Sequence, residues 1–483
     1  MNTPSKWALV LVSLAWLAGC ATPVPHRTAV APDATPCTDN AAPPCATRST
    51  EVSIAPDYTL HVVEFDDQGW MHPRPETARA GPAVGEAHGQ IDRAMKDLSQ
   101  RLGADQRVLL MVYVHGWKHS AAHDDRDVMR FRQMLADAAR LDVLQSTARG
   151  VAKRSVVGIY VGWRGAGGLS ASNPLVHLTF WTRKNAALHI SEGASRELFS
   201  RIRALRERAN TAQVGGPKLR TVVVGHSFGA WIVFSAMSPA LLEMMARPVD
   251  QEPPPAPAAM QEAWHDLRRR QVADIVVLVN PAFEASRYQP LHSLANRVAL
   301  PQHEAPVLVL VTSMADLATR AAFPAGRFFN TIFQRPFLSD EESRASVRAP
   351  GFMEEYRTHS LTRGTDAEPP ECAGWKDIPR RDAAVPPGSP AEAARARQVV
   401  ANARAELMRH VAWEREVERV GGTPANGFSW RYCGSRLDHL GMFSPRTPVW
   451  NVVTDKSMVE DHSDIMGESL HAFLRQLYLD LPR

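Results

Sequence analysis

One stretch in the middle of the chain, Arg220–Phe234, constrains the fold more than any other feature. Its sequence is RTVVVGHSFGAWIVF: an apolar, valine-rich run meets Gly225-His226-Ser227-Phe228-Gly229, and an apolar helical run follows at once. Such a run predicts a buried strand, and glycines at Gly225 and Gly229 permit a turn too tight for side chains. The stretch therefore predicts a strand, a sharp turn and a helix, with the hydroxyl of Ser227 exposed on the turn.

Other apolar runs predict further strands of the same sheet. They are short and nearly continuous, which is typical of parallel strands that are buried on both faces. Helical patterns lie between them at about 87–102 and 192–208, and another follows the last run at 467–479. Alternating strands and helices predict an α/β fold, with a mostly parallel central sheet and helices on both faces. The runs are 58–65, 107–114, 155–161, 221–224, 274–279, 307–311 and 448–453.

The G-x-S-x-G pattern in this strand, turn and helix setting resembles the nucleophile elbow of the α/β-hydrolases, specifically their serine esterase and lipase branch. The resemblance covers about residues 58–324 and 448–479. It implies the α/β-hydrolase fold, with Ser227 as the nucleophile. It also implies that an acid and then a histidine follow the serine along the chain.

Two acidic residues stand directly after predicted strands and are candidates for the acid. Asp316 follows the run 307–311, and Glu284 follows the run 274–279. The resemblance favours Asp316, because this fold usually carries its acid after the penultimate strand. Glu284 remains the alternative.

The predicted catalytic histidine is His462. It lies after the last strand and before the last helix, where the resemblance implies this residue. His439 and His471 are rivals, but the first lies in an insertion and the second inside a predicted helix. The order serine, acid, histidine then matches that of the hydrolases and differs from those of chymotrypsin and subtilisin.

The run 107–114 ends in His115-Gly116-Trp117. In the hydrolases that the chain resembles, a loop of this type after the third strand supplies a backbone N–H to the oxyanion hole. The resemblance therefore implies that the N–H groups of Trp117 and Phe228 form the oxyanion hole. We expect His115 to brace the loop rather than to act as a base.

These parts predict a serine hydrolase that cleaves small-molecule or lipid esters through an acyl-enzyme. The sequence contains no H-E-x-x-H, P-loop or C-x-x-C pattern, so we predict neither a metal nor another cofactor. The net charge of +4 is slight, and the basic residues are scattered along the chain. This pattern does not indicate nucleic-acid binding. A different class remains open: an inactive hydrolase body that serves as a binding or scaffold module.

The N-terminus is typical of an exported protein. Residues 1–19 contain Lys6 and an apolar run, and they end in Leu-Ala-Gly before Cys20. This ending resembles the lipobox of bacterial lipoproteins, which implies cleavage before Cys20 and lipidation of its sulfur. Ala21 then implies the outer membrane, with the protein facing the periplasm. Residues 20–56 are rich in Pro, Ala and Thr and predict an extended tether.

Four cysteines remain besides Cys20, and an even number suits an oxidising compartment. They allow three pairings, of which we favour two disulfides with short or local loops. These are Cys37 with Cys45 and Cys372 with Cys433.

The predicted domain organisation places a hydrolase core at 57–325 and 448–483, interrupted by an insertion at 326–447. The insertion contains a long helix announced by the capping box Ser389-Pro390-Ala391-Glu392. It is expected to be a cap over the pocket or a docking surface for a protein partner that the sequence does not identify.

Overall fold

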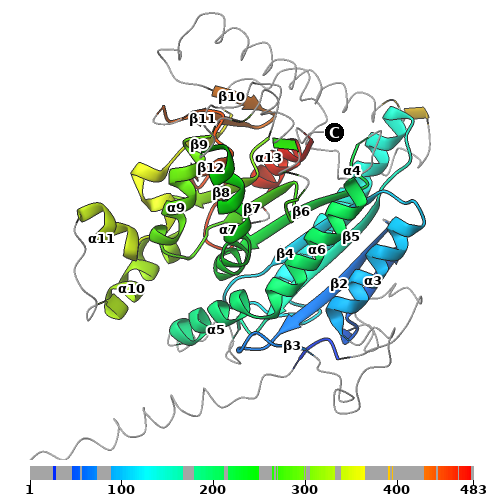
Figure 1. Ribbon diagram of the computed structural model, residues 1–483, viewed down its shortest axis with the longest axis horizontal. Coiled ribbons are helices and arrows are strands. Elements are labelled where there is room, and N and C mark those ends of the chain that lie inside the picture. The colour runs from blue at the N-terminus through cyan, green and yellow to red at the C-terminus, as the bar shows by residue number, and fades with distance from the viewer. Residues whose placement is uncertain are drawn as a thin grey trace, which may run out of the picture.

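The computed structural model describes most of the chain, and its elements form an α/β fold around one large mixed sheet (Figure 1). The strand order is β1-β2-β5-β4-β6-β7-β8-β12-β9-β11-β10, with the short β3 paired to β2. The described residues are 25–28, 46–54, 57–72, 89–166, 179–211, 216–249, 264–265, 268, 270–298, 300, 305–331, 339–364, 390–391, 394, 429–441, 444–465 and 467–479.

The centre of the sheet is parallel, and its two edges are antiparallel. All pairs from β2 across to β9 are parallel, whereas β1, β3, β11 and β10 add antiparallel strands. The strands are β1 (Thr50–Ile54), β2 (Asp57–Phe65), β3 (Met71–His72), β4 (Val108–Val114), β5 (Ser155–Trp163), β6 (Leu219–His226), β7 (Ile275–Val279), β8 (Leu308–Ser313), β9 (His359–Arg363), β10 (Ser429–Tyr432), β11 (Ser435–His439) and β12 (Val449–Thr454).

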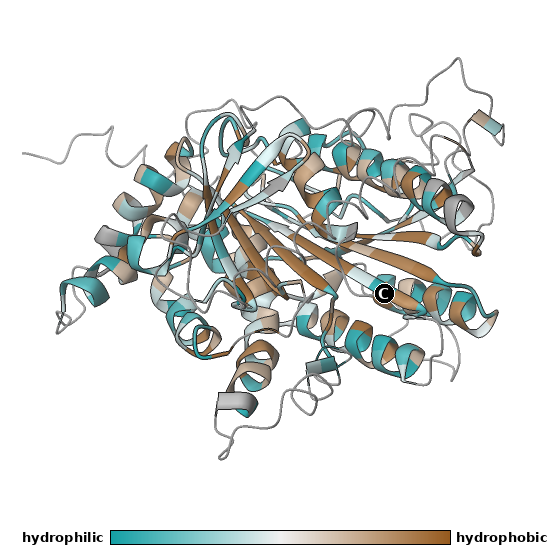
Figure 2. Ribbon diagram, turned by 90° about the horizontal axis from the view of Figure 1, so that it is seen from above, coloured by the Kyte–Doolittle hydropathy of each residue, from teal (hydrophilic) through white to brown (hydrophobic). Residues whose placement is uncertain are grey.

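Helices cover both faces of this sheet, and Figure 2 shows apolar strands between helices that carry many polar residues. Because side chains alternate along a strand, each central strand feeds two cores. Helices α3 (Gln90–Gly103), α5 (Phe180–Glu192), α6 (Ala194–Asn210), α7 (Phe228–Val249) and α9 (Ala285–Ala295) pack on one face, and α4 (Arg126–Arg149) and α13 (Glu468–Leu479) on the other. Helices α10 (Phe323–Thr331) and α11 (Asp340–Val347) lie beside α9 at one end (Figure 1).

The predicted α/β class and its mostly parallel sheet are confirmed. Each of the seven apolar runs forms a strand whose ends lie within two residues of the predicted ends. These runs were recognisable because a strand in the middle of a parallel sheet has apolar neighbours on both faces. In β4, for example, every residue except Met111 is fully or almost fully buried.

The region 326–447 is less separate than the sequence suggested. Its β9 pairs in parallel with β12, and β11 and β10 extend the sheet beyond β9. These strands contribute Leu361, Trp430 and Leu437 to the same core as α13. Part of the predicted insertion is therefore part of the central sheet. Almost all of its long helix after Ser389 lies outside the described residues.

The predicted tether is wrong in part, because two of its pieces belong to the folded body. β1 pairs with β2, and Arg27 is fully buried. Arg27 donates to the carbonyl of Ala121 at 2.8 Å and to Glu51 at 2.8 Å, and Glu51 also pairs with Arg132 at 2.8 Å. Composition did not reveal this, because a charged residue is buried only when tertiary structure supplies its partner. The folded body therefore begins before residue 57.

Helix α7 is long and apolar enough to span a membrane, judged by length and composition alone, and within the described residues no other helix meets this test. The qualifying segment is Phe228–Arg247, of which 61% is buried. Its residues Trp231, Ile232 and Val233 pack in the core beneath the sheet. A helix in the centre of a core can have the same apolar composition as a membrane span. The burial of α7 in the core therefore explains its composition.

Candidate active site

Ser227 occupies the turn between β6 and α7, in a strained conformation. Its φ is +54°, a left-handed value that residues other than glycine rarely adopt. The flanking glycines are required: a Cβ on Gly229 would lie 2.2 Å from the carbonyl oxygen of Val114, and one on Gly225 would lie 2.8 Å from the Cα of Ala230. The turn can be this tight only because both positions lack side chains, and it presents the Ser227 hydroxyl at the end of the strand.

The structure brings Ser227, His462 and Asp316 together in one hydrogen-bonded line. Nε2 of His462 lies 2.9 Å from Oγ of Ser227, and its Nδ1 lies 2.7 Å from Oδ2 of Asp316. The three residues follow β6, β12 and β8, and parallel strands end at the same edge of a sheet. Residues far apart in the sequence therefore meet at this edge.

Asp316 is suited to stay ionised. It is fully buried and accepts hydrogen bonds from His462 and from the N–H of Ala318 at 2.8 Å. Burial raises its pKa, but the hydrogen bond and charge of His462, together with hydrogen bonds from Thr319, outweigh burial and hold the pKa below its usual value. A carboxylate in this position fixes the orientation of the imidazole and favours a proton on Nδ1.

Glu284, the alternative acid, is engaged elsewhere. Its carboxylate is 2% exposed and pairs with Lys184 at 2.5 Å, Arg327 at 2.8 Å and Arg287 at 3.0 Å. Burial raises the pKa of Glu284, but these cations outweigh it and lower the pKa. The acid that contacts His462 is therefore Asp316, and Glu284 joins α5, α9 and α10 through ion pairs.

The loop His115-Gly116-Trp117 passes directly over the serine. A Cβ on Gly116 would lie 2.8 Å from the Cβ of Ser227, so only glycine permits this approach. The indole of Trp117 lies against the ring of Phe228, with centroids 6.4 Å apart. Phe228 is the first residue of α7, and the N–H of such a residue has no acceptor within its own helix. Trp117 and Phe228 thus lie on the two backbone segments that flank Ser227.

His115 braces this loop, as the sequence analysis expected. It is fully buried, stacks on Trp163 with ring centroids 5.5 Å apart, and accepts the Trp163 N–H at Nε2 over 3.0 Å. Burial lowers its pKa to about 4, so the ring is neutral at neutral pH. Its Nδ1–H then donates to the carbonyl of Gly116 at 2.8 Å.

The two rival histidines are not part of the site. His439 lies at the end of β11 with its ring against His359, and His471 lies within α13. The hydrogen-bonded partner of Ser227 is His462.

Two residues that the sequence analysis passed over hold the His462 loop in place. The ring of His226 donates from Nε2 to the carbonyl of His462 at 2.8 Å. The amide of Asn280 donates to the same carbonyl at 3.2 Å and accepts the N–H of Ser313 at 2.9 Å. Asn280 is fully buried with a φ of +45°, which asparagine tolerates better than most residues. An asparagine directly after an apolar strand was the available signal.

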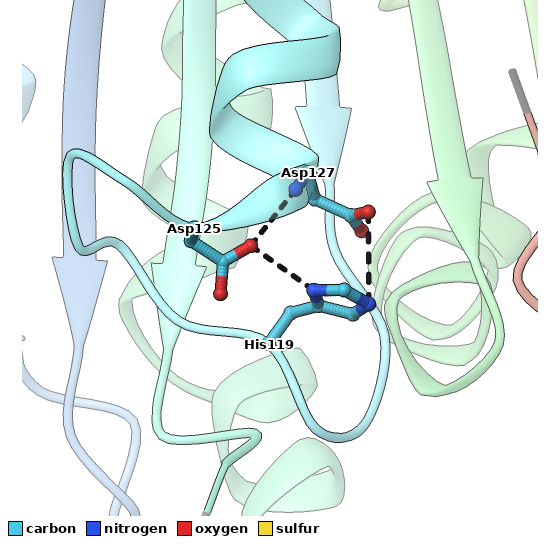
Figure 3. A group of neighbouring side chains, drawn as sticks. All are labelled: His119, Asp125 and Asp127. Carbon is cyan, nitrogen blue, oxygen red and sulfur yellow. Dashed lines mark hydrogen bonds and ion pairs between the residues drawn. The ribbon is translucent and has the colours of Figure 1, made fainter. Parts of the chain in front are cut away.

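A second group of polar side chains consists of His119, Asp125 and Asp127 (Figure 3). It follows the loop His115-Gly116-Trp117 in the chain. Nδ1 of His119 is 3.0 Å from Asp125, its Nε2 is 3.6 Å from Asp127, and Arg130 is 3.8 Å from Asp127. Burial lowers the pKa of His119, but the two carboxylates outweigh it and raise the pKa. Both carboxylates already have partners within the protein, because Asp125 contacts His119, and Asp127 contacts His119, Arg130 and the hydroxyl of Tyr113 at 2.7 Å. We interpret the group as an ion-pair cluster that fixes the loop to α4.

The predicted disulfides stay predictions. Cys433 is buried after β10, and its predicted partner Cys372 lies outside the described residues, as do Cys37 and Cys45. Cys20 and the predicted signal also lie outside the described residues.

Comparison of the chain with protein-family models, curated proteins and solved structures gave no match. We therefore infer a function from the geometry of the site and from the pattern of the sequence.

The role of Asn280 can be measured as stability. We expect Asn280→Ala to lower the free energy of unfolding by about 2–4 kcal/mol, because it removes the side-chain acceptor of the buried Ser313 N–H and one of the two donors to the carbonyl of His462, and it places alanine at positive φ. Asn280→Gly should be less destabilising than Asn280→Ala by about 1 kcal/mol, because glycine adopts a positive φ without strain, although it does not restore the lost hydrogen bonds. Urea denaturation measures both.

Asn296→Ala is the matched control, since this partly exposed residue lies at the end of α9. If Asn280→Ala were no more destabilising than Asn296→Ala, the bridging role of Asn280 would be wrong.

Proposed function

We propose that this protein is a serine hydrolase with the α/β-hydrolase fold, which cleaves acyl esters through Ser227, His462 and Asp316. The observation that carries the proposal is the continuous hydrogen-bonded line from Oγ of Ser227 through His462 to a buried carboxylate. A serine, a histidine and an acid in this relation form the arrangement that activates a hydroxyl for attack on a carbonyl.

The proposed reaction proceeds in two halves. Nε2 of His462 takes the proton of Ser227 as the hydroxyl oxygen attacks the ester carbonyl, and Asp316 stabilises the imidazolium that forms. The tetrahedral oxyanion accepts hydrogen bonds from the N–H groups of Trp117 and Phe228. His462 then protonates the leaving alcohol, and an acyl group remains on Ser227. In the second half, His462 activates water, which attacks the acyl-enzyme and releases the acid.

The topology supports this assignment as well. Ser227 follows β6, the acid follows β8 and the histidine follows β12, and β8 and β12 are neighbouring parallel strands. The glycine loop after β4 reaches Ser227 because β4 and β6 are also neighbours. Each expected part of a hydrolase site is thus at the same edge of the sheet.

The substrate side of the site has an aromatic wall. The rings of Trp117, Phe180 and Phe228 lie in mutual contact, with Phe180 and Phe228 5.3 Å apart. Phe180 also contacts Phe323, and both Trp117 and Phe180 are partly exposed. An apolar wall beside the serine favours an ester with an apolar acyl group or alcohol.

We also propose that the chain is a lipoprotein of the bacterial envelope, anchored through Cys20, with the hydrolase facing the periplasm. The support is the Leu-Ala-Gly-Cys ending of an apolar leader. The second class of function, an inactive scaffold, has less support because a scaffold has no need of an intact Ser, His and Asp line.

The nucleophile is tested by Ser227→Ala. We expect this change to reduce hydrolysis of a p-nitrophenyl ester by a factor on the order of 10⁶ and to abolish labelling by a fluorophosphonate. The thermal melt should change little, because alanine keeps the packing of the turn. If the fluorophosphonate did not label the wild-type protein, and the protein hydrolysed neither short nor long esters, the inactive scaffold would be favoured.

The acid is tested by a pair of substitutions. Asp316→Asn should reduce kcat by about 10⁴, because an amide no longer holds His462 in the active tautomer. Glu284→Gln should leave kcat of the folded enzyme nearly unchanged but destabilise the fold by about 3–5 kcal/mol, since it leaves buried cations without their carboxylate. Kinetics and urea denaturation of both variants would show whether these effects separate. A large loss of kcat in folded Glu284→Gln would move the acid to Glu284.

The anchor is tested by fractionation. Wild-type protein made in a Gram-negative cell should sediment with the membranes, and Cys20→Ser should not, because the thiol is the acceptor of the lipid. Wild-type protein recovered free in the periplasm would overturn the lipoprotein assignment.

A further inference from the structure

An apolar groove lies between α4 and α13, on the opposite face of the sheet from α7. Its floor is formed by alternate residues of three neighbouring strands, β4, β6 and β7, whose side chains point to the same face. These residues are Leu109, Met111, Val222, Val224, Ile275 and Val277. The groove has a cavity volume of about 70 Å³, several times the 10–15 Å³ or so that one water molecule requires.

The floor of this groove is open at a place where central strands are normally covered. Met111 and Val222 lie in the middle of β4 and β6 and are nevertheless partly exposed, as is Leu474 of α13. The same two strands are closed on their other face, where Leu110 and Val223 have no exposed surface. An open apolar floor costs free energy in water, so it favours an apolar occupant.

One charged side chain at the groove has unused hydrogen-bond donors. Nε and Nη1 of Arg475 are buried, and they have no hydrogen-bond partner among the residues that the structure describes. A buried donor of a charged group without an acceptor costs more than the roughly 1–3 kcal/mol of a neutral one. An anionic ligand group would satisfy it, since guanidinium groups bind carboxylates and phosphates in particular.

The acidic side chains at the groove are already engaged. Asp137 accepts hydrogen bonds from Gln133 at 2.9 Å and Arg140 at 2.6 Å, and Asp142 accepts the N–H of Arg154 at 2.6 Å. His471 carries no charge at neutral pH, because burial lowers its pKa to about 4. The charges of Asp137 and Glu468 act on Arg475, but among the described residues neither accepts a hydrogen bond from its buried Nε or Nη1.

We infer that this groove binds a single acyl chain with an anionic head, such as a fatty acid, whose carboxylate pairs with Arg475 while its chain lies over Met111 and Val222. The apolar lining favours a hydrocarbon chain, and the buried donors of Arg475 favour an anionic head group. The site is separate from Ser227: Leu109 is near the start of β4, and the loop over Ser227 follows the end of that strand.

The experiment uses the full chain with Ser227→Ala, so that neither ligand can react at the serine, and measures binding of decanoate and of decan-1-ol by calorimetry. We expect decanoate to bind about tenfold more tightly than the alcohol, which corresponds to about 1.4 kcal/mol. Arg475→Gln should abolish this preference by weakening decanoate alone. Arg208→Gln, an exposed arginine on α6 across the sheet, is the matched control and should change neither ligand.

A second variant tests the floor. Val222→Phe fills the groove and should weaken both ligands by about tenfold or more, with folding checked by its thermal melt. If that variant does not fold, Arg475→Gln alone decides. Equal binding of both ligands to the starting protein, or unchanged decanoate binding in Arg475→Gln, would overturn the inference. So would a dimer of the starting protein that forms through the groove without binding decanoate, because its occupant would then be a second copy.

Discussion

The backbone carbonyl of His462 is the point at which the ends of several strands are tied together. It accepts hydrogen bonds from His226 at the end of β6 and from Asn280 just after β7. Asn280 also holds the N–H of Ser313 at the end of β8. A loop fixed at this carbonyl places the imidazole between Ser227 and Asp316. Since a displacement of about 1 Å can cost a factor of 10² in rate, the proposed reaction depends on this carbonyl as well as on the three side chains.

Protonation states follow from the same arrangement. Burial keeps the pKa of His226 well below its usual value, so its ring is neutral and can donate from Nε2 without adding positive charge beside His462. Asp316, by contrast, receives enough hydrogen bonds to remain an anion in a fully buried place. The neutral rings of His226 and His115 thus hold the loops of the site in place through hydrogen bonds. The carboxylate of Asp316 provides the negative charge.

Buried ion pairs join segments that the apolar core leaves unconnected. Arg27 and Arg132 share Glu51, which attaches the N-terminal segment and β1 to α4. Lys184, Arg287 and Arg327 share Glu284, which joins three helices near the aromatic wall. Breaking such a pair is costly because the remaining charge is buried without a partner. These pairs therefore specify where the outer segments attach to the sheet.

The sequence by itself determined the strands of the central sheet, the turn at Ser227 and the order of serine, acid and histidine. Apolar runs and glycines act locally, so each could be read from a few neighbouring residues. The choice between Asp316 and Glu284, the supporting roles of Asn280 and His226, the burial of Arg27 and the addition of β9, β11 and β10 to the sheet were decided only by the tertiary structure. Each of these features depends on a partner far away in the chain. Asp316 and Glu284 both follow a predicted strand, so the sequence alone does not show which of them lies beside His462 and which beside Lys184.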